Sequence, residues 1–448
     1  MGLESVFPAV TVVGMPKGLL MPVTGLRGAT ASGAAVSFAA VLVFSSTVSA
    51  QASHSVEEFD QPSDSSSSYP APGQPVGGVG GSQGDPEETT VQKAGGDLRV
   101  ATLNADLTDS SLEDLLDSLK GGADAEARAV AETAQLNAPD VLVVTGISYD
   151  EDEQIAETFN EQYLGRSQNG EDALDYPYVY TDETNSGLDS GADLDGDGQI
   201  GGPGDAFGYG NYTGEHSMAI FSTQPIVTDE VRTFQSFLWD DMPENGMPED
   251  DYSDVERSIM RLACATVWDV PVETEGGEHL HLVATTKPEI GDDVEMDADR
   301  GDDQRRMLAD YISGDGWYIY DDEGEEGGLH PDDDFVVVGQ PANKTAELDE
   351  DLETLLKSPF LQDPEPEAVT EQPLSTRPGA DDSDPLATRS VSGGPDVRAS
   401  YTLPSNTVDV SGSGVFWPGR DEFGFDLVDP SEDASPENRL VWVDLAES

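Results

Sequence analysis

Seven short apolar runs recur along the chain from residue 97 onward, and they constrain its fold more than any other feature. They are Leu98–Leu103, Val141–Ile147, Met218–Phe221, Leu280–Ala284, Phe335–Val338, Arg398–Leu403 and Leu440–Val443. Many are nearly continuous rather than alternating, which is typical of strands covered on both faces. Helix-forming residues dominate 124–136, which stops before Pro139, and 302–312. Mixed strands with covering helices indicate a layered α/β sandwich.

The N-terminal segment has the pattern of an export signal. Residues 1–50 contain no Asp and one Glu, and the apolar run 34–43 follows Lys17 and Arg27. Small residues up to Ala50 fit a cleavage site, so we expect a secretory signal peptide over 1–50 and a secreted or cell-envelope protein. The alternative is an uncleaved N-terminal anchor, although the run is too short and too rich in Ser and Gly to favour a spanning helix.

Composition divides the remaining chain into a linker and a folded domain. Residues 51–95 are rich in Ser, Gly, Pro and acidic residues, which predicts a disordered linker. Residues 96–448 are expected to form the domain, and they contain no second long apolar stretch, so we expect no transmembrane span in the mature chain. Long acidic insertions separate the apolar runs, at 183–215, 240–257, 288–301 and 363–397.

The charge balance is extremely acidic, with 90 Asp and Glu against 21 Lys and Arg and a formal net charge of −69. Phosphate contacts need a basic surface, so this balance argues against a nucleic-acid groove and against docking on anionic lipid. It suits high salt, divalent cations or solubility alone. The single cysteine, Cys264, excludes an intramolecular disulfide, and we interpret it as a buried, inert thiol in a strand.

Several segments together resemble secreted bacterial members of the endonuclease/exonuclease/phosphatase superfamily. They are "LRVATLNADL" (98–107), "APDVLVVTGISYD" (138–150), "DLDGDGQIGGPGDAFGYG" (193–210), "VRTFQSFLWDDMP" (231–243), "VWDVPV" (267–272), "YIYDD" (318–322), "ASYTLPS" (399–405), "SGVFWP" (413–418) and "RLVWVDL" (439–445). The resemblance implies a four-layer sandwich, in which two mixed β-sheets pack face to face between helices. It also implies phosphoester hydrolysis with Mg²⁺ or another divalent ion in active members.

The family takes its catalytic residues from strand ends, and most corresponding positions here hold other residue types. The Asn of the first strand is retained as Asn104. The other positions hold Gly146 for the metal-binding Glu, Thr286 for a His, Gln340 and Ala342 for the Asp and Asn of a Gly-Asp-x-Asn turn, Ser400 for an Asp, and Glu437 and Asn438 for the final Asp-His pair. The resemblance therefore predicts that the Mg²⁺ site is lost.

The histidines support the same interpretation. The five are His54, His216, His279, His281 and His330. His279 and His281 lie on one face of an expected strand, upstream of the position where the family places its histidine. A two-histidine phosphodiesterase site would need distant members of this set to converge, so we interpret them as surface or hydrogen-bonded sheet residues.

One loop has the spacing of a cation site. Asp193, Asp195 and Asp197 place carboxylates at alternate positions, as in the first half of a calcium loop. The twelfth position lacks the usual Glu, and the following Asp205 is the expected substitute, while Ile200 is expected to pack under the loop. The spacing predicts Ca²⁺ over 193–205, and an acidic turn without an ion is the alternative.

Three functional interpretations follow. The first is a secreted family member that has lost its catalytic centre, a pseudoenzyme kept for binding or for an envelope role. The second is an active divalent-metal phosphodiesterase or nuclease, in which Asn104 works with displaced acids such as Asp106, Asp150 or Glu437. The third is an acidic surface protein tethered by 51–95. The sequence specifies neither ligand nor oligomeric state.

Overall fold

The computed structural model describes residue 93 and residues 95–248, 252–286, 294–341, 350–369, 385–390, 396–429 and 436–446. All of them belong to one unit of the chain, Pro70–Ser448. The predicted signal segment, almost all of the predicted linker and Ala342 lie outside the described residues. Within the described part of the chain, no helix combines the length and the apolar character that crossing a membrane requires.

The first sheet is mixed and has the strand order β10-β11-β1-β2-β4-β3. Its strands are β1 (Asp97–Leu107), β2 (Val141–Ile147), β3 (Tyr178–Tyr180), β4 (Ser217–Ser222), β10 (Val410–Val415) and β11 (Val441–Ala446). β1 and β2 are parallel, and the other neighbours are antiparallel. The central strands are buried along almost their whole length, as the continuous apolar runs predict.

The second sheet has the order β5-β6-β7-β8-β9. Its strands are β5 (Arg232–Thr233), β6 (Val267–Glu273), β7 (His279–Thr285), β8 (Asp334–Gly339) and β9 (Tyr401–Pro404). Here β7 and β8 are the parallel pair. Each sheet therefore has one parallel pair at its centre and antiparallel strands toward its edges.

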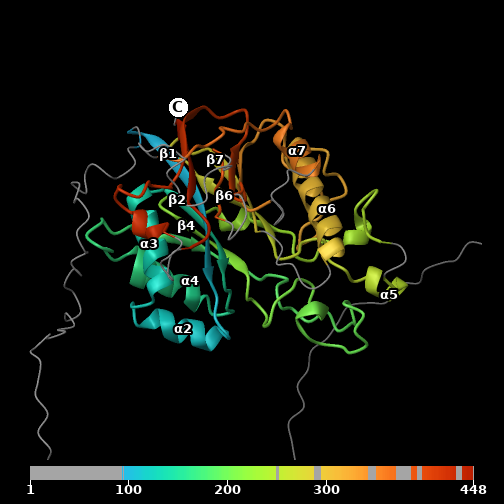
Figure 1. Ribbon diagram of the computed structural model, residues 1–448. Coiled ribbons are helices and arrows are strands. Elements are labelled where there is room, and N and C mark those ends of the chain that lie inside the picture. Colours follow the sequence, from blue (N-terminus) through green and yellow to red (C-terminus); the bar gives the residue numbers. More distant parts are fainter. Residues whose placement is uncertain are drawn as a thin grey trace, which may run out of the picture. The chain divides into compact units, whose positions relative to one another are not determined.

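Helices cover the outer face of each sheet (Figure 1). The helices on the first sheet are α2 (Leu112–Lys120), α3 (Ala125–Asn137) and α4 (Gln154–Phe159), and those on the second are α6 (Val294–Ser313) and α7 (Glu350–Leu356), while α5 (Asp254–Arg257) lies in an insertion. Ser111 and Asp124 cap α2 and α3 through hydrogen bonds from Asp114 N (3.2 Å) and Ala127 N (2.9 Å). Pro139 explains why α3 ends at Asn137.

Three apolar cores hold these layers together. One core joins the inner faces of the two sheets, with Val100 and Ile220 on the first packed against Trp268 and Leu282 on the second. The other two cores fill the spaces between each sheet and its helices. The fold is thus an α/β sandwich of two mixed sheets flanked by helices, which confirms the predicted fold class.

Three local predictions were wrong. Cys264 is buried, but it lies in a bend before β6 rather than in a strand. Ile200 is 67% exposed, and Leu194 is the residue of that loop that packs into the core. The strand predicted at 398–403 begins only at Tyr401, because Arg398 is held before it by an ion pair with Asp363 (2.7 Å).

Candidate functional site

Four of the residues that the sequence identified as site candidates, Asn104, Gln340, Ser400 and Asn438, lie together near the ends of strands. The parallel pairs bring Asn104 beside Thr145 in the first sheet and Thr285 beside Gly339 in the second. Asn104, near the end of β1, donates a hydrogen bond to Gln340, which follows β8, so the carboxyl ends of the two parallel pairs lie at the same end of the sandwich. Turns and strands far apart in the sequence therefore supply one small cluster of side chains.

Gln340 is the centre of this cluster. Its Oε1 accepts a hydrogen bond from Asn104 Nδ2 (2.6 Å), and its Nε2 donates to Asn438 Oδ1 (3.2 Å) and to Ser400 Oγ (3.4 Å). In the first sheet, Asn104 lies in β1 and Asn438 precedes β11. In the second sheet, Gln340 follows β8 and Ser400 precedes β9. We call these four residues the amide cluster. It bridges the two sheets with neutral polar groups.

The amide cluster is buried, so a ligand has little access to its side chains. Gln340 is 1% exposed, and Ser400 is fully buried, while Asn104 and Asn438 are nearly so. The side-chain acceptor of Asn104, its Oδ1, accepts a hydrogen bond from the backbone N–H of Asp106 (3.2 Å). Each amide of the cluster is therefore engaged by groups of the chain itself.

Gly146 lies directly against this cluster. A Cβ atom on Gly146 would sit 2.8 Å from Asn104 Oδ1, and its φ of +67° is in the left-handed region that favours glycine. The register of β2 shifts at this point, between Thr145 and Ile147. The local backbone therefore accepts no side chain at position 146 without rearrangement.

Thr286 is also buried beside the amide cluster. The backbone oxygen of the preceding Thr285 accepts from Gln340 N (2.9 Å), and Thr285 Oγ1 accepts from Gln304 Nε2 of α6 (3.1 Å). Gln304 was not recognised from the sequence. Its position within the predicted helix 302–312 was visible, but nothing in the sequence showed which turn of α6 faces the strand end.

The three acids considered for a rearranged site have different surroundings. Both oxygens of Asp150 accept backbone N–H groups at the start of α4, from Gln154 (3.1 Å) and Ile155 (2.9 Å). Glu437 is exposed and pairs with Arg389 (2.9 Å). Asp106 follows Asn104 on β1, and its side chain is exposed. Asp106 is thus the acid of this set that adjoins the amide cluster through a backbone contact.

The loop with calcium-like spacing gathers its three alternate acids. Asp193, Asp195 and Asp197 each offer a carboxylate oxygen within 4.8 Å of the others. Asp205 is buried beneath them, and its oxygens accept from the N–H groups of Leu194 (2.7 Å) and Gly201 (2.7 Å). Asp205 therefore fastens the two ends of the loop together. Calcium binding, with Asp205 as a ligand, stays a prediction.

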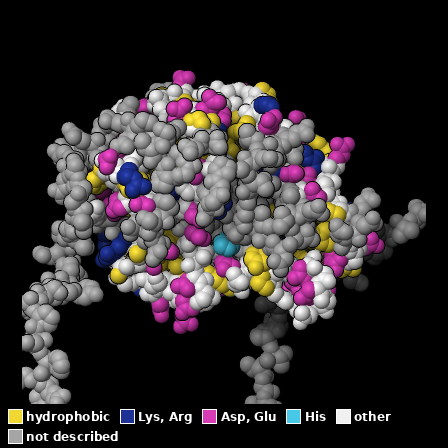
Figure 2. Space-filling model, in the orientation of Figure 1, with side chains coloured by type: hydrophobic (Ala, Val, Ile, Leu, Met, Phe, Trp, Pro, Cys, Tyr) yellow, Lys and Arg dark blue, Asp and Glu magenta, His cyan; other side chains and the backbone are white. Residues whose placement is uncertain are grey.

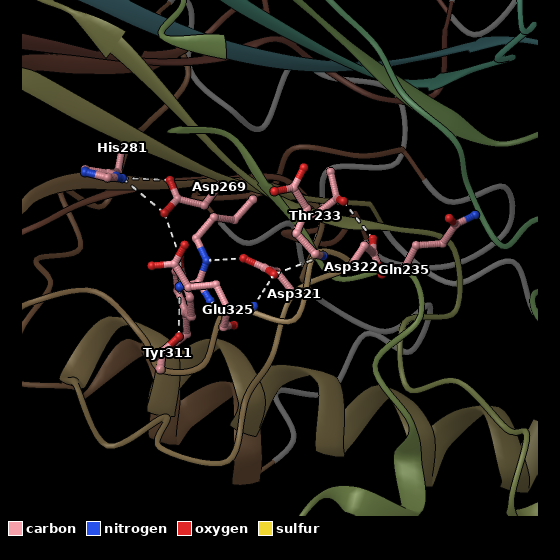
Figure 3. A network of polar contacts seen from close by, with 11 residues as sticks. Thr233, Gln235, Asp269, His281, Tyr311, Asp321, Asp322 and Glu325 are labelled. Carbon is pink, nitrogen blue, oxygen red and sulfur yellow. Dashed lines mark hydrogen bonds and ion pairs between the residues drawn. The ribbon is translucent and has the colours of Figure 1, made fainter. Parts of the chain in front are cut away.

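A second polar network lies on the helix-covered face of the second sheet (Figure 3). His281 Nδ1 contacts Asp269 Oδ1 (2.9 Å), and Asp269 Oδ2 also accepts from the Tyr311 hydroxyl (2.6 Å). Arg232 contacts the Tyr311 hydroxyl (3.4 Å) and forms an ion pair with Asp321 (2.7 Å). The network joins the three adjacent strands β5, β6 and β7 with α6 and the loop after it.

The electrostatics of this network follow from burial and from one carboxylate. Burial lowers the pKa of His281, but the hydrogen bond to Asp269 and its charge raise it more, so the net shift is upward. Burial also raises the pKa of the Tyr311 hydroxyl well above its usual value, and the Asp269 charge adds to that shift. The sequence carried a signal for this pairing, because alternation along "VWDVPV" and "HLHLV" places Asp269 and His281 on one face.

The chain is similar to a known protein family and to several solved structures. The profile of the Endonuclease/Exonuclease/phosphatase family matches residues 101–339. A solved endonuclease/exonuclease/phosphatase from Beutenbergia cavernae is similar at 15% identity, with 78% of this chain and 71% of that chain covered and a TM-score of 0.43. The human Nocturnin catalytic domain is similar at 13% identity, with 79% and 95% covered and a TM-score of 0.40. No curated protein sequence matches the chain.

Proposed function

This chain belongs to the endonuclease/exonuclease/phosphatase family, whose profile covers more than half of its 448 residues, and we propose that it is a member without phosphoester hydrolysis. The amide cluster is the observation that carries the proposal. At the strand ends where the family holds its metal and its base, Gln340 binds Asn104, Ser400 and Asn438 instead. The fold is kept, and these positions serve to connect the two sheets.

The amide cluster does not fit the divalent ion of the family. Mg²⁺ is bound through carboxylates and keeps a near-ideal octahedral shell. In the four residues of the amide cluster, the side-chain oxygens that could bind a metal belong to amides and to one hydroxyl. The amide oxygens of Asn104 and Gln340 already accept hydrogen bonds from N–H groups. At position 146, where the family's metal carboxylate is expected, a Cβ atom would displace the Asn104 side chain from its hydrogen bonds. We therefore derive no hydrolytic step through a metal at this place.

The competing proposal is a rearranged active site, and the contacts of the three candidate acids favour Asp106 for it. Asp150 caps a helix and Glu437 pairs with Arg389, so each already has a structural partner. Asp106 combines an exposed carboxylate with a backbone contact to Asn104. A hydrolase built on this chain would depend on Asp106 and Asn104 together.

An activity assay distinguishes the two proposals. Purified protein is incubated with bis-p-nitrophenyl phosphate and with DNA in the presence of Mg²⁺, Mn²⁺ or Ca²⁺. We expect turnover no greater than that of Asn104→Ala. Metal-dependent turnover that is lost in both Asn104→Ala and Asp106→Asn, but kept in the control Asp117→Asn on the exposed face of α2, would overturn the proposal.

The second part of the proposal is that the protein acts outside the cell as a binding or envelope protein. It rests on the sequence of 1–50 and of the linker 51–95, together with the acidic charge. Because the amide cluster is buried, it does not indicate which ligand the protein binds. N-terminal sequencing of the exported protein should find a chain that begins at Gln51. Deletion of 51–95 should change retention at the cell surface without changing the stability of the domain.

A further inference from the structure

Two histidines stand side by side on β7, away from the amide cluster. His279 and His281 are two residues apart on one strand, so their side chains share a face and their Cα atoms are about 6.6 Å apart. Their side chains are 35% and 19% exposed, so both are open to solvent. Thr285, beside the amide cluster, lies at the other end of the same strand, about 20 Å from His279 by the rise of a strand.

Each imidazole is held by a carboxylate through the same ring nitrogen. His279 Nδ1 contacts Glu230 Oε2 (3.0 Å), and His281 Nδ1 contacts both oxygens of Asp269 (2.9 and 3.1 Å). An ionised carboxylate only accepts hydrogen bonds, so in each neutral ring Nδ1 carries the proton. The lone pair then lies on Nε2, and this is the arrangement in which carboxylates orient metal-binding histidines in proteins.

The carboxylate behind His281 is fixed by the network of Figure 3. Asp269 is 1% exposed and is held from the other side by the Tyr311 hydroxyl (2.6 Å). Arg232 contacts that hydroxyl and is itself anchored to Asp321 and to the backbone oxygen of Gly327 (2.9 Å). The orientation of the His281 ring is thus set by groups from β5, β6 and α6. Because the ring is already ordered, it would lose little conformational entropy on binding an ion.

We propose that His279 and His281 form a transition-metal site, with Zn²⁺ bound by the two Nε2 atoms and water in the remaining positions. Imidazole nitrogen suits Zn²⁺, Cu²⁺ and Ni²⁺, whereas Ca²⁺ and Mg²⁺ prefer oxygen. Zn–N bonds of about 2.0–2.1 Å allow two imidazoles at this spacing to share one ion. Within the described residues, the only group of three or more potential metal-binding side chains is formed by Asp193, Asp195 and Asp197. No third protein ligand therefore lies beside His279 and His281 in that part of the chain, and the proposed site has two protein ligands.

The surrounding charge favours a cation at this place. Glu230 and Asp333 lie close enough to His281 to act on it electrostatically. Asp and Glu side chains are spread over the surface, with few Lys and Arg among them, as one face shows in Figure 2. Such a field raises the local concentration of cations. The site is independent of the amide cluster, so its failure would leave the proposed function unaffected.

The test is a titration of the purified protein with Zn²⁺, followed by calorimetry, in a millimolar excess of Mg²⁺ that occupies weak carboxylate sites. We expect one saturable site that is lost in His281→Gln and in His279→Gln. The controls His330→Gln and Asp193→Ala, which change an exposed loop histidine and the acidic loop, should bind as the wild type does. Co²⁺ should give a visible absorption band that reports nitrogen ligation and disappears in the same two variants.

The supporting carboxylates provide a second test. Removing an outer partner of a metal-bound histidine lowers affinity about 10–100-fold, so Glu230→Gln and Asp269→Asn should each weaken Zn²⁺ binding within that range. Glu230 is half exposed, so its variant is expected to fold even if the buried Asp269→Asn variant does not. Absence of saturable binding, or Zn²⁺ binding that persists in both histidine variants, would overturn the proposal.

Discussion

Gly146→Glu restores the carboxylate that the family uses for its metal, and we expect it to destabilise this protein without creating a metal site. The reason is the backbone at position 146. Its φ is +67°, and a Cβ atom would meet Asn104 Oδ1 at 2.8 Å. A side chain introduced at position 146 would thus meet an unfavourable backbone conformation and the neighbouring Asn104.

The magnitude can be worked from these contacts. A side chain in the left-handed region costs about 1–2 kcal/mol. Displacing Asn104 weakens its hydrogen bonds to Gln340 and to Asp106 N, each worth about 0.5–1.5 kcal/mol. Gly146→Ala should therefore lower the free energy of unfolding by about 2–5 kcal/mol. Gly146→Glu should lose more, because an ionised carboxylate buried without a partner costs several kcal/mol.

Urea unfolding followed by tryptophan fluorescence measures these losses. Gly122→Ala is the matched control, because Gly122 has φ +60° but its nearest neighbour to a new Cβ, the Gln162 backbone oxygen, is 3.9 Å away. It should show the backbone cost alone. Addition of Mg²⁺ should not restore the Gly146→Glu variant. The reasoning is refuted if Gly146→Ala is no less stable than Gly122→Ala, or if Mg²⁺ stabilises Gly146→Glu selectively.

Three further predictions concern other parts of the fold. Asp444→Ala should lower the free energy of unfolding by about 3–5 kcal/mol in the same urea assay, because the buried Arg99 would lose the carboxylate that accepts from its Nε (2.6 Å) and Nη2 (2.7 Å). Burial, with the charges of nearby acids, raises the pKa of Glu132 from 4.5 to about 7, so stability should fall as the pH rises through that interval. Glu132→Gln should remove up to about 3 kcal/mol of that pH dependence, which unfolding at pH 5 and pH 8 would measure. Calorimetry with Ca²⁺ should give heat that Asp195→Ala abolishes, and absence of heat from the wild type would refute calcium binding at the loop.

The strands were predictable wherever burial on both faces made them continuously apolar. β1, β2, β4, β7 and β8 all contain such runs, in which buried apolar residues outnumber the polar ones. β10 was not predicted, since its residues "VSGSGV" are small and polar and are ordered by pairing with β11. α6 proved longer than the predicted helix 302–312, because its first turns come from an acidic insertion that composition alone assigned to a loop.

The candidate site was predictable in its membership but not in its contacts. The sequence identified Asn104, Gly146 and Gln340 through the order of the surrounding segments. It did not show that the side chain of Gln340 spans both sheets, since that depends on strand ends from opposite layers. Likewise, Asp205 was expected to bind an ion, whereas its contacts with Leu194 and Gly201 depend on how the loop closes.

The distribution of charge connects these observations. Acids that converge in a cleft repel one another unless a cation neutralises them, so a catalytic site of this family would need its metal for stability as well as for chemistry. In the function that we propose for this strongly acidic protein, hydrogen bonds between Asn104, Gln340 and Asn438 take the place of that arrangement, and their energy does not depend on a bound ion. The contacts between the two sheets at this place would then need no bound divalent ion for their stability. Any dependence of this domain on divalent ions should then arise from the surface, at the acidic loop or at the paired histidines of β7.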